Sequence, residues 1–308
     1  MTRPRPVKLL KNIKLTLKDK KLFNKYLALS KHVLAAFSFA NIYIWKSLFD
    51  IHWVIIDHTL CVFFRDKIGC FMYLPPLAGE RRPEALKKAF TIMDVINKNK
   101  DISRIENIEL QDLDYYRALG YIVRQKYPDY LCLRSDLAKL SGNKFKSQRA
   151  SYNYFIKHQN FNARKLRVTD KTDCLNLFSL WLNERKGKSS DEIYCGMLDD
   201  NRKVISEALV NYKQLGFAGI AVMINREIKG FTFGYKLSKD TFCVLYEITD
   251  LAIKGLAQFI FRKLCEELKI YKYINIMDDS GLGNLKKVKL SYHPVRAVAA
   301  YIVQRENV

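Results

Sequence analysis

The sequence contains no apolar stretch long enough to cross a membrane. Its longest run without a charged residue, Val33 to Trp45, has 13 residues, whereas a transmembrane helix needs about 20. The basic N-terminus also lacks the continuous apolar core and the small-residue cleavage site of a secretory signal. We therefore predict a cytoplasmic protein without a transmembrane segment.

Patterns typical of metal binding and of disulfides are equally absent. The seven cysteines are scattered and include no CxxC pair, and the five histidines show neither HxxxH nor HxH spacing. An even set of cysteines or such close spacings would indicate a disulfide framework or a zinc site. The sequence therefore predicts reduced thiols, no metal site and no tightly bound cofactor.

Acidic residues are scarce relative to basic ones. The chain has 53 Lys and Arg against 31 Asp and Glu, which gives a net charge of +22 over 308 residues. Such an excess favours anionic partners. Because 49% of the residues are hydrophobic, the chain can also bury two cores, and we do not interpret it as a disordered basic tail.

The positive charge is concentrated in three segments. Residues 1–26 hold nine basic residues against one acidic, residues 137–169 hold eight against none, and residues 280–305 hold five against none. Each segment alone is compatible with a solvated helix face, but three together favour a surface that contacts several phosphates. We expect tRNA as the partner. The alternative is peripheral binding to the anionic inner membrane face, for which the first segment would supply an interfacial helix.

Helical and strand patterns are mixed along the whole chain, which predicts an α+β fold. In the second half, the alternating apolar runs 218–224 and 228–237 flank a short polar link, as in a β-hairpin. The pattern then predicts a strand at 241–248, a helix at 256–268 and a strand at 271–277.

The first half has its own set of elements. Residues 52–74 predict a meander of strands, and Pro83 stands at the first turn of a predicted helix. We place an N-terminal domain at 1–140 and a C-terminal domain at 141–308, the second opening with a basic helix.

The order hairpin, strand, helix, strand resembles the second half of the Gcn5-related N-acetyltransferase (GNAT) fold. In that superfamily the pyrophosphate of acyl-CoA lies on a glycine-containing loop at the helix N-terminus, a position that suits phosphate. Gly255 and Ala257 match this loop, whereas Ala252 stands where the family has Arg or Gln. The resemblance implies a role for Gly255 and Ala257 in binding a donor.

A second resemblance covers nearly the whole chain. The matching segments are Phe39–Trp45, Leu74–Leu77, Gly219–Gly234, Glu247 with Gly255, and Gly281–Pro294. They are similar to the bacterial family called domain of unknown function 2156, which is related to the C-terminal domain of phosphatidylglycerol lysyltransferase. The resemblance implies two tandem GNAT-like domains in a Fem-like arrangement, and relatives that take an amino acid from aminoacyl-tRNA.

The C-terminal motif of that family runs roughly N-R-E-x-D-L-G-x-x-G-L-R-K-A-K-x-S-Y-x-P. Its matching positions here include Asn275, Asp279, Gly281, Lys286, Lys287, Lys289, Tyr292 and Pro294. Ile276 and Met277 stand where the family has Arg and Glu. If that pair takes part in catalysis, this chain has altered or lost activity.

The resemblance and the charge together give the candidate site residues. We expect Glu247 to hold an ammonium group of a donor or acceptor, Lys289 to polarise an ester carbonyl or bind a phosphate, and Tyr292 to pass a proton. Lys144, Lys146, Arg149, Lys286 and Lys287 are candidate phosphate ligands, and Asn275 and Asp279 are further site residues. The alternative for each is a structural or simply exposed side chain.

Three functions fit these observations. The first is an aminoacyltransferase that uses aminoacyl-tRNA as donor and a small amine, a hydroxyl compound or a lipid headgroup as acceptor. The second is an acyl-CoA-dependent N-acyltransferase. The third is a non-catalytic scaffold that binds RNA or an anionic membrane. This function is favoured by Ile276 and Met277, which stand where the family has Arg and Glu.

Overall fold

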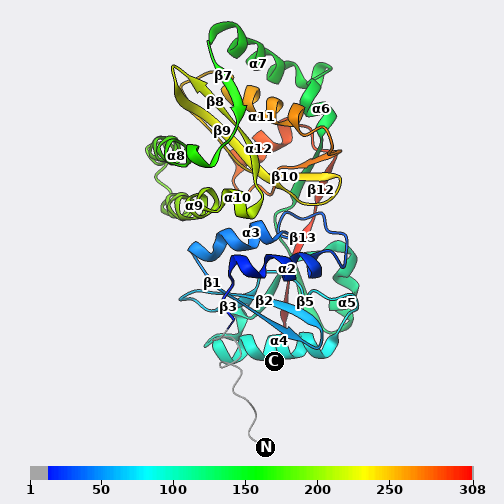
Figure 1. Cartoon of the computed structure of the whole chain (residues 1–308). Helices are drawn as coiled ribbons and strands as arrows, with labels where there is room; N and C mark the ends of the chain where they lie inside the picture. The colour runs from blue at the N-terminus through cyan, green and yellow to red at the C-terminus, as the bar shows by residue number, and fades with distance from the viewer. Residues whose placement is uncertain (1–12, 307–308) are drawn as a thin grey trace, which may run out of the picture. The chain divides into compact units, whose positions relative to one another are not determined.

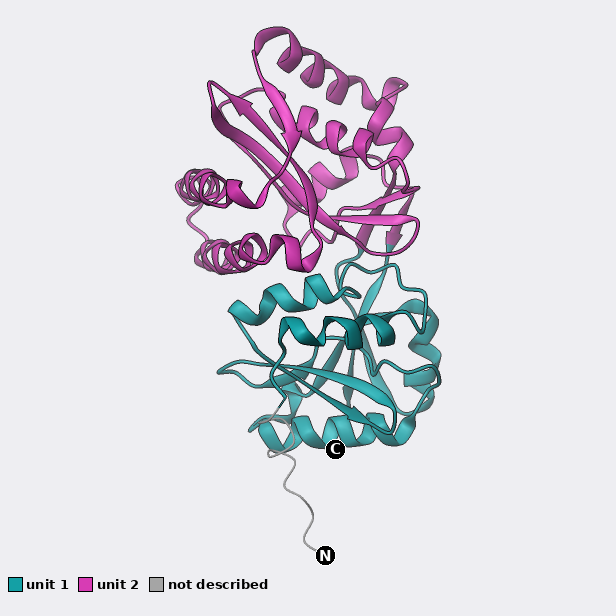
Figure 2. Cartoon of the chain, viewed as in Figure 1, with its two compact units in different colours: residues 1–128, 298–308 teal, residues 129–297 magenta. Residues whose placement is uncertain are grey.

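The computed structural model describes residues 13–306, which form two compact units (Figure 2). The first unit contains the chain up to residue 128 together with the residues from 298 onward, and the second contains residues 129–297. Each unit has its own β-sheet and its own hydrophobic core. The chain therefore enters the second unit once and returns to the first.

The first unit is built on a six-stranded sheet in the order β1-β2-β3-β4-β13-β5 (Figure 1). Its helices and strands are α2 (Lys20–Leu27), α3 (Phe39–Ile44), β1 (Asp50–Ile56), β2 (Thr59–Arg65), β3 (Cys70–Met72), α4 (Pro83–Ile96), β4 (Arg104–Glu109), α5 (Leu113–Ala118), β5 (Tyr121–Gln125) and β13 (Ala300–Arg305). Short 3-10 turns lie at Leu17–Asp19, Trp45–Ser47, Lys100–Ile102 and Leu110–Asp112.

The local sequence explains most of this unit. Strands β1, β2 and β3 are antiparallel neighbours, so the predicted meander over 52–74 is present. Pro83 occupies the first turn of α4, where its missing N–H costs no hydrogen bond. The apolar face of α4, which includes Leu86, Phe90 and Met93, is buried in the core with strand residues such as Phe63.

The second unit is built on a seven-stranded sheet in the order β12-β6-β11-β10-β9-β8-β7. Its helices and strands are β6 (Asp129–Leu133), α6 (Arg134–Lys139), α7 (Lys146–His158), β7 (Asn162–Lys165), α8 (Lys171–Lys186), α9 (Glu192–Val210), α10 (Tyr212–Leu215), β8 (Ala218–Ile224), β9 (Glu227–Lys236), β10 (Thr241–Thr249), α11 (Leu256–Glu267), β11 (Tyr273–Asn275), α12 (Gly283–Ser291) and β12 (Arg296–Val298). Short 3-10 turns precede α7 and α8, at Asn143–Phe145 and Val168–Asp170.

The predicted hairpin, strand, helix and strand are all present, as β8, β9, β10, α11 and β11. Helix α11 carries its apolar residues on one face, and this face packs with residues of β8 and β10, including Ile260, Leu264, Val222 and Phe242. Helices α8 and α9 lie on the other face of the sheet (Figure 1). Local sequence patterns did not predict this pair of helices.

The observed division of the chain differs from the predicted one at both ends. Strand β6 pairs antiparallel with β11, which puts residues 129–139 in the second unit and not in a domain ending at 140. Strand β13 pairs antiparallel with β4 and β5, which puts the end of the chain in the first unit. Both differences arise from strand pairing over long sequence distances, which local patterns do not reveal.

The N-terminal basic segment is only partly described. Residues 1–12, which hold the first part of the segment predicted to form an interfacial helix, lie outside the described residues. Of the remainder, Leu15 is buried and Lys14 forms an isolated β-bridge with His52. None of the helices within residues 13–306 combines the length and the apolar character needed to span a bilayer.

Candidate active site

Strands β10 and β11 separate in the middle of the second sheet. They are parallel and pair only from Thr241 to Cys243 on β10, whereas β10 continues to Thr249. The pairing of β10 with β9 is shifted between Val244 and Tyr246, which marks a β-bulge. Bulges of this kind re-aim side chains and are common beside functional sites. The half of β10 beyond Cys243 therefore has one edge that is not paired with β11.

Glu247 lies on this part of β10. Its side chain is only partly exposed, and it makes no hydrogen bond or ion pair with any residue that the structure describes. Burial raises the pKa of Glu247 to about 8, although the positive charge of Lys289 works in the opposite direction. A carboxyl group with a pKa near neutrality can both take up and release a proton at physiological pH.

Tyr292 and Lys289 lie close enough to Glu247 to interact with it electrostatically. The charge of Glu247 contributes to the raised pKa of Tyr292, after the larger effect of burial. The Tyr292 ring packs against Phe261 with a centroid distance of 4.6 Å. Its hydroxyl makes no hydrogen bond with another described residue. The three predicted catalytic residues, which come from β10 and from the end of α12, are thus in one place.

The ammonium group of Lys289 is already engaged by the backbone. It donates to the carbonyl oxygen of Ile276 and, at 3.2 Å, to that of Met277. Met277 has a φ of +61°, which is uncommon for a residue with a side chain. Burial lowers the pKa of Lys289, while the carboxylates of Asp278 and Asp129 oppose this effect. Lys289 therefore fixes the chain just after β11, and its charge also reaches the site.

Asn275 and Asp279 form the remainder of this anchoring network. The Asn275 amide donates to Asp129 at 2.9 Å and accepts from the backbone N–H of Met277 at 2.7 Å. Asp279 accepts from the Tyr130 hydroxyl at 2.6 Å and from the N–H of Gly281 at 2.9 Å. These are structural contacts, so the motif residues Asn275 and Asp279 position the loop between β11 and α12.

Gly255 and Ala257 lie at the N-terminus of α11, as the sequence predicted. Gly255 has a φ of +83°, and a Cβ atom there would lie 2.0 Å from the backbone oxygen of Ser151. The glycine is thus required for the close approach of α7 to α11. The loop before Gly255 also holds the carboxylate of Asp250, which accepts a hydrogen bond from the N–H of Ala252 at 3.1 Å. Packing alone accounts for Gly255, whether or not a phosphate binds.

The three basic residues near the start of α7 differ from one another. Lys144 pairs with Asp136 at 2.9 Å. Arg149 donates to the carbonyl oxygens of Leu140 and, at 2.7 Å, Gly142. Lys146 is exposed and has no partner among the described residues. Of the three, Lys146 is therefore the side chain most available to an anion.

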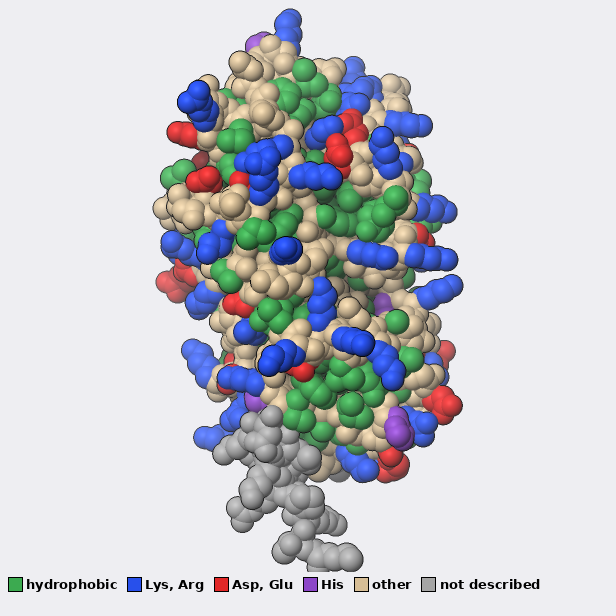
Figure 3. All heavy atoms as spheres, viewed as in Figure 1, with side chains coloured by type: hydrophobic (Ala, Val, Ile, Leu, Met, Phe, Trp, Pro, Cys, Tyr) green, Lys and Arg blue, Asp and Glu red, His purple; other side chains and the backbone are tan. Residues whose placement is uncertain are grey.

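Two of the basic segments meet within the second unit. Gln148 of α7 donates to the carbonyl oxygen of Ser291 at 2.6 Å, and the Phe145 ring packs edge-on against His293. Lys286 and Lys287 are exposed on the adjoining helix α12. Lys and Arg side chains are also widespread on the face drawn in Figure 3, where acidic ones are fewer. The start of α7 and α12 together form the candidate anion-binding surface.

Comparison with known proteins gives a family. The family described as "Phosphatidylglycerol lysyltransferase, C-terminal" matches residues 28–304 of this sequence. The chain belongs to this family. The predicted resemblance is thereby confirmed, and it covers both units. No curated protein matches the sequence.

Several solved structures are also similar to this chain of the phosphatidylglycerol lysyltransferase family. A conserved protein of unknown function from Bacteroides thetaiotaomicron is 26% identical, with a TM-score of 0.86 over 96% of this chain and 100% of its own. L-PGS from Bacillus licheniformis is 16% identical, with a TM-score of 0.64 over 94% of this chain and 93% of its own.

The predicted fold class is confirmed by a third structure. A tandem GNAT protein from the clavulanic acid biosynthesis pathway has a TM-score of 0.52 at 9% identity, over 96% of this chain and 98% of its own. At this identity the likeness concerns the fold alone. This chain is therefore an α+β protein with a tandem GNAT-like fold.

Two polar residues of the network around Asn275 and Asp279 were not predicted from the sequence. Asp129 and Tyr130 begin β6 and bind motif residues that lie 146 and 149 positions later in the chain. The hydrogen bond to Asp279, together with burial, raises the pKa of Tyr130 to about 12. Nothing local marks either residue. The matching motif of the family indicated Asn275 and Asp279 but not the residues that they bind.

Proposed function

We propose that the second unit holds an aminoacyltransferase site centred on Glu247. The donor is an aminoacyl-tRNA, and the acceptor is a small amine, a hydroxyl compound or a lipid headgroup. The observation that supports this best is the partly buried, unpartnered carboxyl group of Glu247, with its pKa of about 8, beside Tyr292 and Lys289. Membership of a family described as a lysyltransferase supports aminoacyl transfer as the reaction.

The reaction needs one proton to move. The acceptor nitrogen or oxygen attacks the ester carbonyl carbon, a new C–N or C–O bond forms, and the C–O bond to the tRNA ribose breaks. The ionised form of Glu247, which is the smaller fraction below its pKa of about 8, takes the acceptor proton and returns it to the ribose oxygen, so protons balance. Tyr292, which burial keeps protonated, donates a hydrogen bond to the carbonyl oxygen as negative charge develops there.

The donor would be held mainly by charge. Lys146, Lys286 and Lys287 are exposed on neighbouring elements of the same unit. Lysines in such positions bind phosphates through counterion release and without reading bases. Lys289 would act differently from the sequence prediction: its ammonium group holds the carbonyls of Ile276 and Met277. It would contribute a fixed positive charge near the reacting ester.

The first experiment compares binding of the purified protein to charged tRNA, deacylated tRNA and a CoA thioester. Preference for charged tRNA supports the proposal, and transfer of a labelled amino acid to a pool of candidate acceptors follows. Glu247→Gln should then reduce transfer about 100-fold or more, while Glu267→Gln, at the exposed end of α11, should leave it unchanged.

The other outcomes decide between the remaining functions. Binding of the CoA thioester without tRNA binding would favour an acyl-CoA-dependent enzyme. Binding of tRNA without preference for the charged form, and without transfer, would favour a non-catalytic scaffold altered at Ile276 and Met277. Turnover by the unmodified protein would exclude that scaffold.

A further inference from the structure

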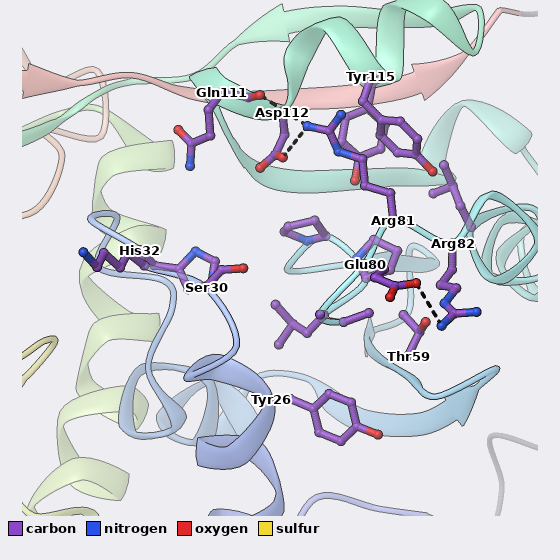
Figure 4. A pocket seen from close by; sticks show the side chains of 18 residues that line it. Tyr26, Ser30, His32, Thr59, Glu80, Arg81, Arg82, Gln111, Asp112 and Tyr115 are labelled. Atoms are coloured by element: carbon purple, nitrogen blue, oxygen red, sulfur yellow. Dashed lines mark hydrogen bonds and ion pairs between the residues drawn. The ribbon is translucent and has the colours of Figure 1, made fainter.

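The first unit contains a cavity that the proposed transferase site does not use. Its volume is about 380 Å³, which lies within the range of small-molecule sites. The lining comes from α2, the segment after it, the start of β2, the segment before α4, and α5. Figure 4 shows Tyr26, Ser30 and His32 on one side of this space and Arg81 and Tyr115 on another.

Several hydrogen-bond donors of this cavity have no partner. The hydroxyls of Ser30, Tyr26, Tyr115 and Tyr116 make no hydrogen bond within the described part of the chain, and the Lys31 ammonium group makes neither a hydrogen bond nor an ion pair there. Tyr116 is only 3% exposed. Ser30 and Lys31 are exposed and water can bind them, whereas a buried polar group without a partner is typical of a site that a ligand completes.

The ring of His32 is held by contacts on one edge and one face. Its Nδ1 lies 2.9 Å from a carboxylate oxygen of Glu109, and its ring stacks on Phe37 at a centroid distance of 3.8 Å. The other nitrogen, Nε2, is buried and has no hydrogen-bond partner in residues 13–306. The geometry thus fixes one nitrogen of the ring and leaves the second for something that the chain does not provide.

Glu109 is the residue that holds the Nδ1 side of the His32 ring. Its side chain is 4% exposed and accepts hydrogen bonds from His32, from the N–H of Val33 and from the Gln111 amide. Burial works to raise the pKa of Glu109, but the hydrogen bonds from His32 and from the N–H of Val33 contribute to lowering it overall. A carboxylate only accepts hydrogen bonds, so the Nδ1 of His32 carries the hydrogen of this contact. An anionic oxygen placed at Nε2 would be bound by a ring that donates at both nitrogens.

The two acidic side chains that line the cavity, by contrast, are both paired. Asp112 binds Arg81 at 3.2 Å, and Glu80 binds Arg82 at 3.3 Å. The cavity therefore combines free donors and free positive charge with acidic groups that are neutralised. A ligand that completes it must be rich in hydrogen-bond acceptors and negatively charged.

We propose that the cavity of the first unit binds a small organic anion that carries a phosphate or a carboxylate group. Lys31 and His32 bind the anionic oxygens, and the tyrosine hydroxyls bind the remaining acceptors. Tyr26 and Tyr115 both line the cavity, and its volume of about 380 Å³ is sufficient for a small organic body. This site lies wholly in the first unit, so it does not depend on the transferase proposal.

The test uses four small probes with the same aromatic body on the full-length protein. Phenyl phosphate and benzoate carry the two candidate anionic groups, benzyl alcohol is neutral, and benzylamine is cationic. Binding is followed by ligand-detected NMR and by calorimetry. We expect at least one anion to bind saturably with a Kd of about 1 mM or tighter, and the neutral and cationic probes to bind at least about 10-fold more weakly.

Variants assign the binding to the cavity. His32→Asn can keep a donor toward Glu109 but has no atom in place of Nε2, and Lys31→Met removes the free charge at similar length. Each should weaken anion binding about 10-fold, as expected for one charge-assisted hydrogen bond. Lys98→Met, on the exposed surface of the same unit, is the matched control and should change it less than 2-fold, a difference below about 0.4 kcal/mol.

Three results would overturn the proposal. They are the absence of saturable binding by either anion, equal or tighter binding of benzylamine, and anion binding that Lys98→Met weakens as much as Lys31→Met does. If His32→Asn fails to fold in a thermal unfolding assay, Lys31→Met and Tyr116→Phe still decide the outcome. Preference between phenyl phosphate and benzoate identifies the anionic group.

Discussion

At the scale of single residues, the burial of the Glu247 carboxyl group is unfavourable to the free energy of folding. It is partly buried, lacks a partner within residues 13–306, and has a pKa of about 8. Removing a carboxylate from water without compensation is unfavourable, so the group stays protonated instead. Such residues are concentrated at functional sites, where stability is lower than it would be with an unreactive side chain.

This predicts a pH-dependent stability difference between the protein and its Glu247→Gln variant. The folded state holds the Glu247 proton up to about pH 8, whereas an ordinary glutamic acid loses it near 4.5. Between these values the folded state binds more protons, so its stability falls as the pH rises through this window. Glutamine does not titrate, so the variant should gain about 2 kcal/mol over the unmodified protein between pH 5 and pH 9, after allowance for solvent screening.

Thermal unfolding at the two pH values measures this difference. The melting temperature of Glu247→Gln relative to the unmodified protein should be higher at pH 9 than at pH 5 by several degrees. Glu267→Gln, on the exposed end of α11, is the control and should show no such trend. A relative melting temperature for Glu247→Gln that does not change with pH would show that the Glu247 carboxyl is solvated.

At the scale of secondary-structure elements, the start of α7 has two roles that the sequence could not separate. Arg149 bonds the carbonyl oxygens of Leu140 and Gly142, which follow α6, and Leu140 has a left-handed φ of +52°. The arginine thus satisfies carbonyl groups at a helix end that would otherwise lack partners. Lys146, three residues earlier, has no comparable contact.

Replacing these two residues separately should distinguish the two roles. Arg149→Gln should destabilise the second unit by about 1–2 kcal/mol, because charge-assisted hydrogen bonds to two carbonyls are lost from a partly exposed site. Lys146→Gln should change stability by less than about 0.5 kcal/mol and weaken only anion binding. Thermal unfolding and tRNA binding of both variants provide the comparison. Equal stability of the two variants would contradict the structural role of Arg149.

Local patterns were sufficient to predict the elements around β10. The hairpin of β8 and β9, the strand β10 and the helix α11 follow from alternation of apolar residues and from helical periodicity, which depend on neighbouring residues only. The contacts of Lys289 and Asn275 could not be predicted in this way. Their partners are backbone carbonyls and a buried carboxylate, whose positions depend on how the strands pair.

At the scale of the whole molecule, the net charge of +22 is the strongest functional signal in the composition. In the second unit the structure identifies which basic side chains are available to a partner. Lys146, Lys286 and Lys287 are exposed and free of ion pairs within the described chain. Lys144 and Arg149 are engaged with other groups of the protein. Of the candidate phosphate ligands that the sequence indicated, Lys144 and Arg149 are therefore less available to an anion than Lys146, Lys286 and Lys287.

Replacing Lys146, Lys286 and Lys287 together by Gln should reduce the dependence of tRNA binding on salt. Each lost phosphate contact lowers the slope of log K against log salt by about 0.7 to 0.9, so the slope should fall by roughly 2 to 3. Replacing Lys67, Lys98 and Lys239 removes the same charge from exposed positions elsewhere and is the control. If both triple variants change the slope equally, net charge and not this surface controls binding.

The division into units was the part of the fold that the sequence predicted least well. Strand β13 was expected to complete the second domain, because it follows that domain directly in the chain. It lies instead between β4 and β5 in the first sheet, about 190 residues from β4 in sequence. Pairing at this distance is decided by packing and by loop closure, not by the pattern of the strand itself.

The place of β13 determines the order in which the chain can fold during synthesis. Strands β4 and β5 are made early, but the strand that lies between them is made after every strand of the second unit. All of residues 129–297 are synthesised before that, so the second unit can reach its final sheet while the first still has a gap. Domains generally fold as they leave the ribosome, from the N-terminus onward. In this protein the first unit to be synthesised is the last to be completed.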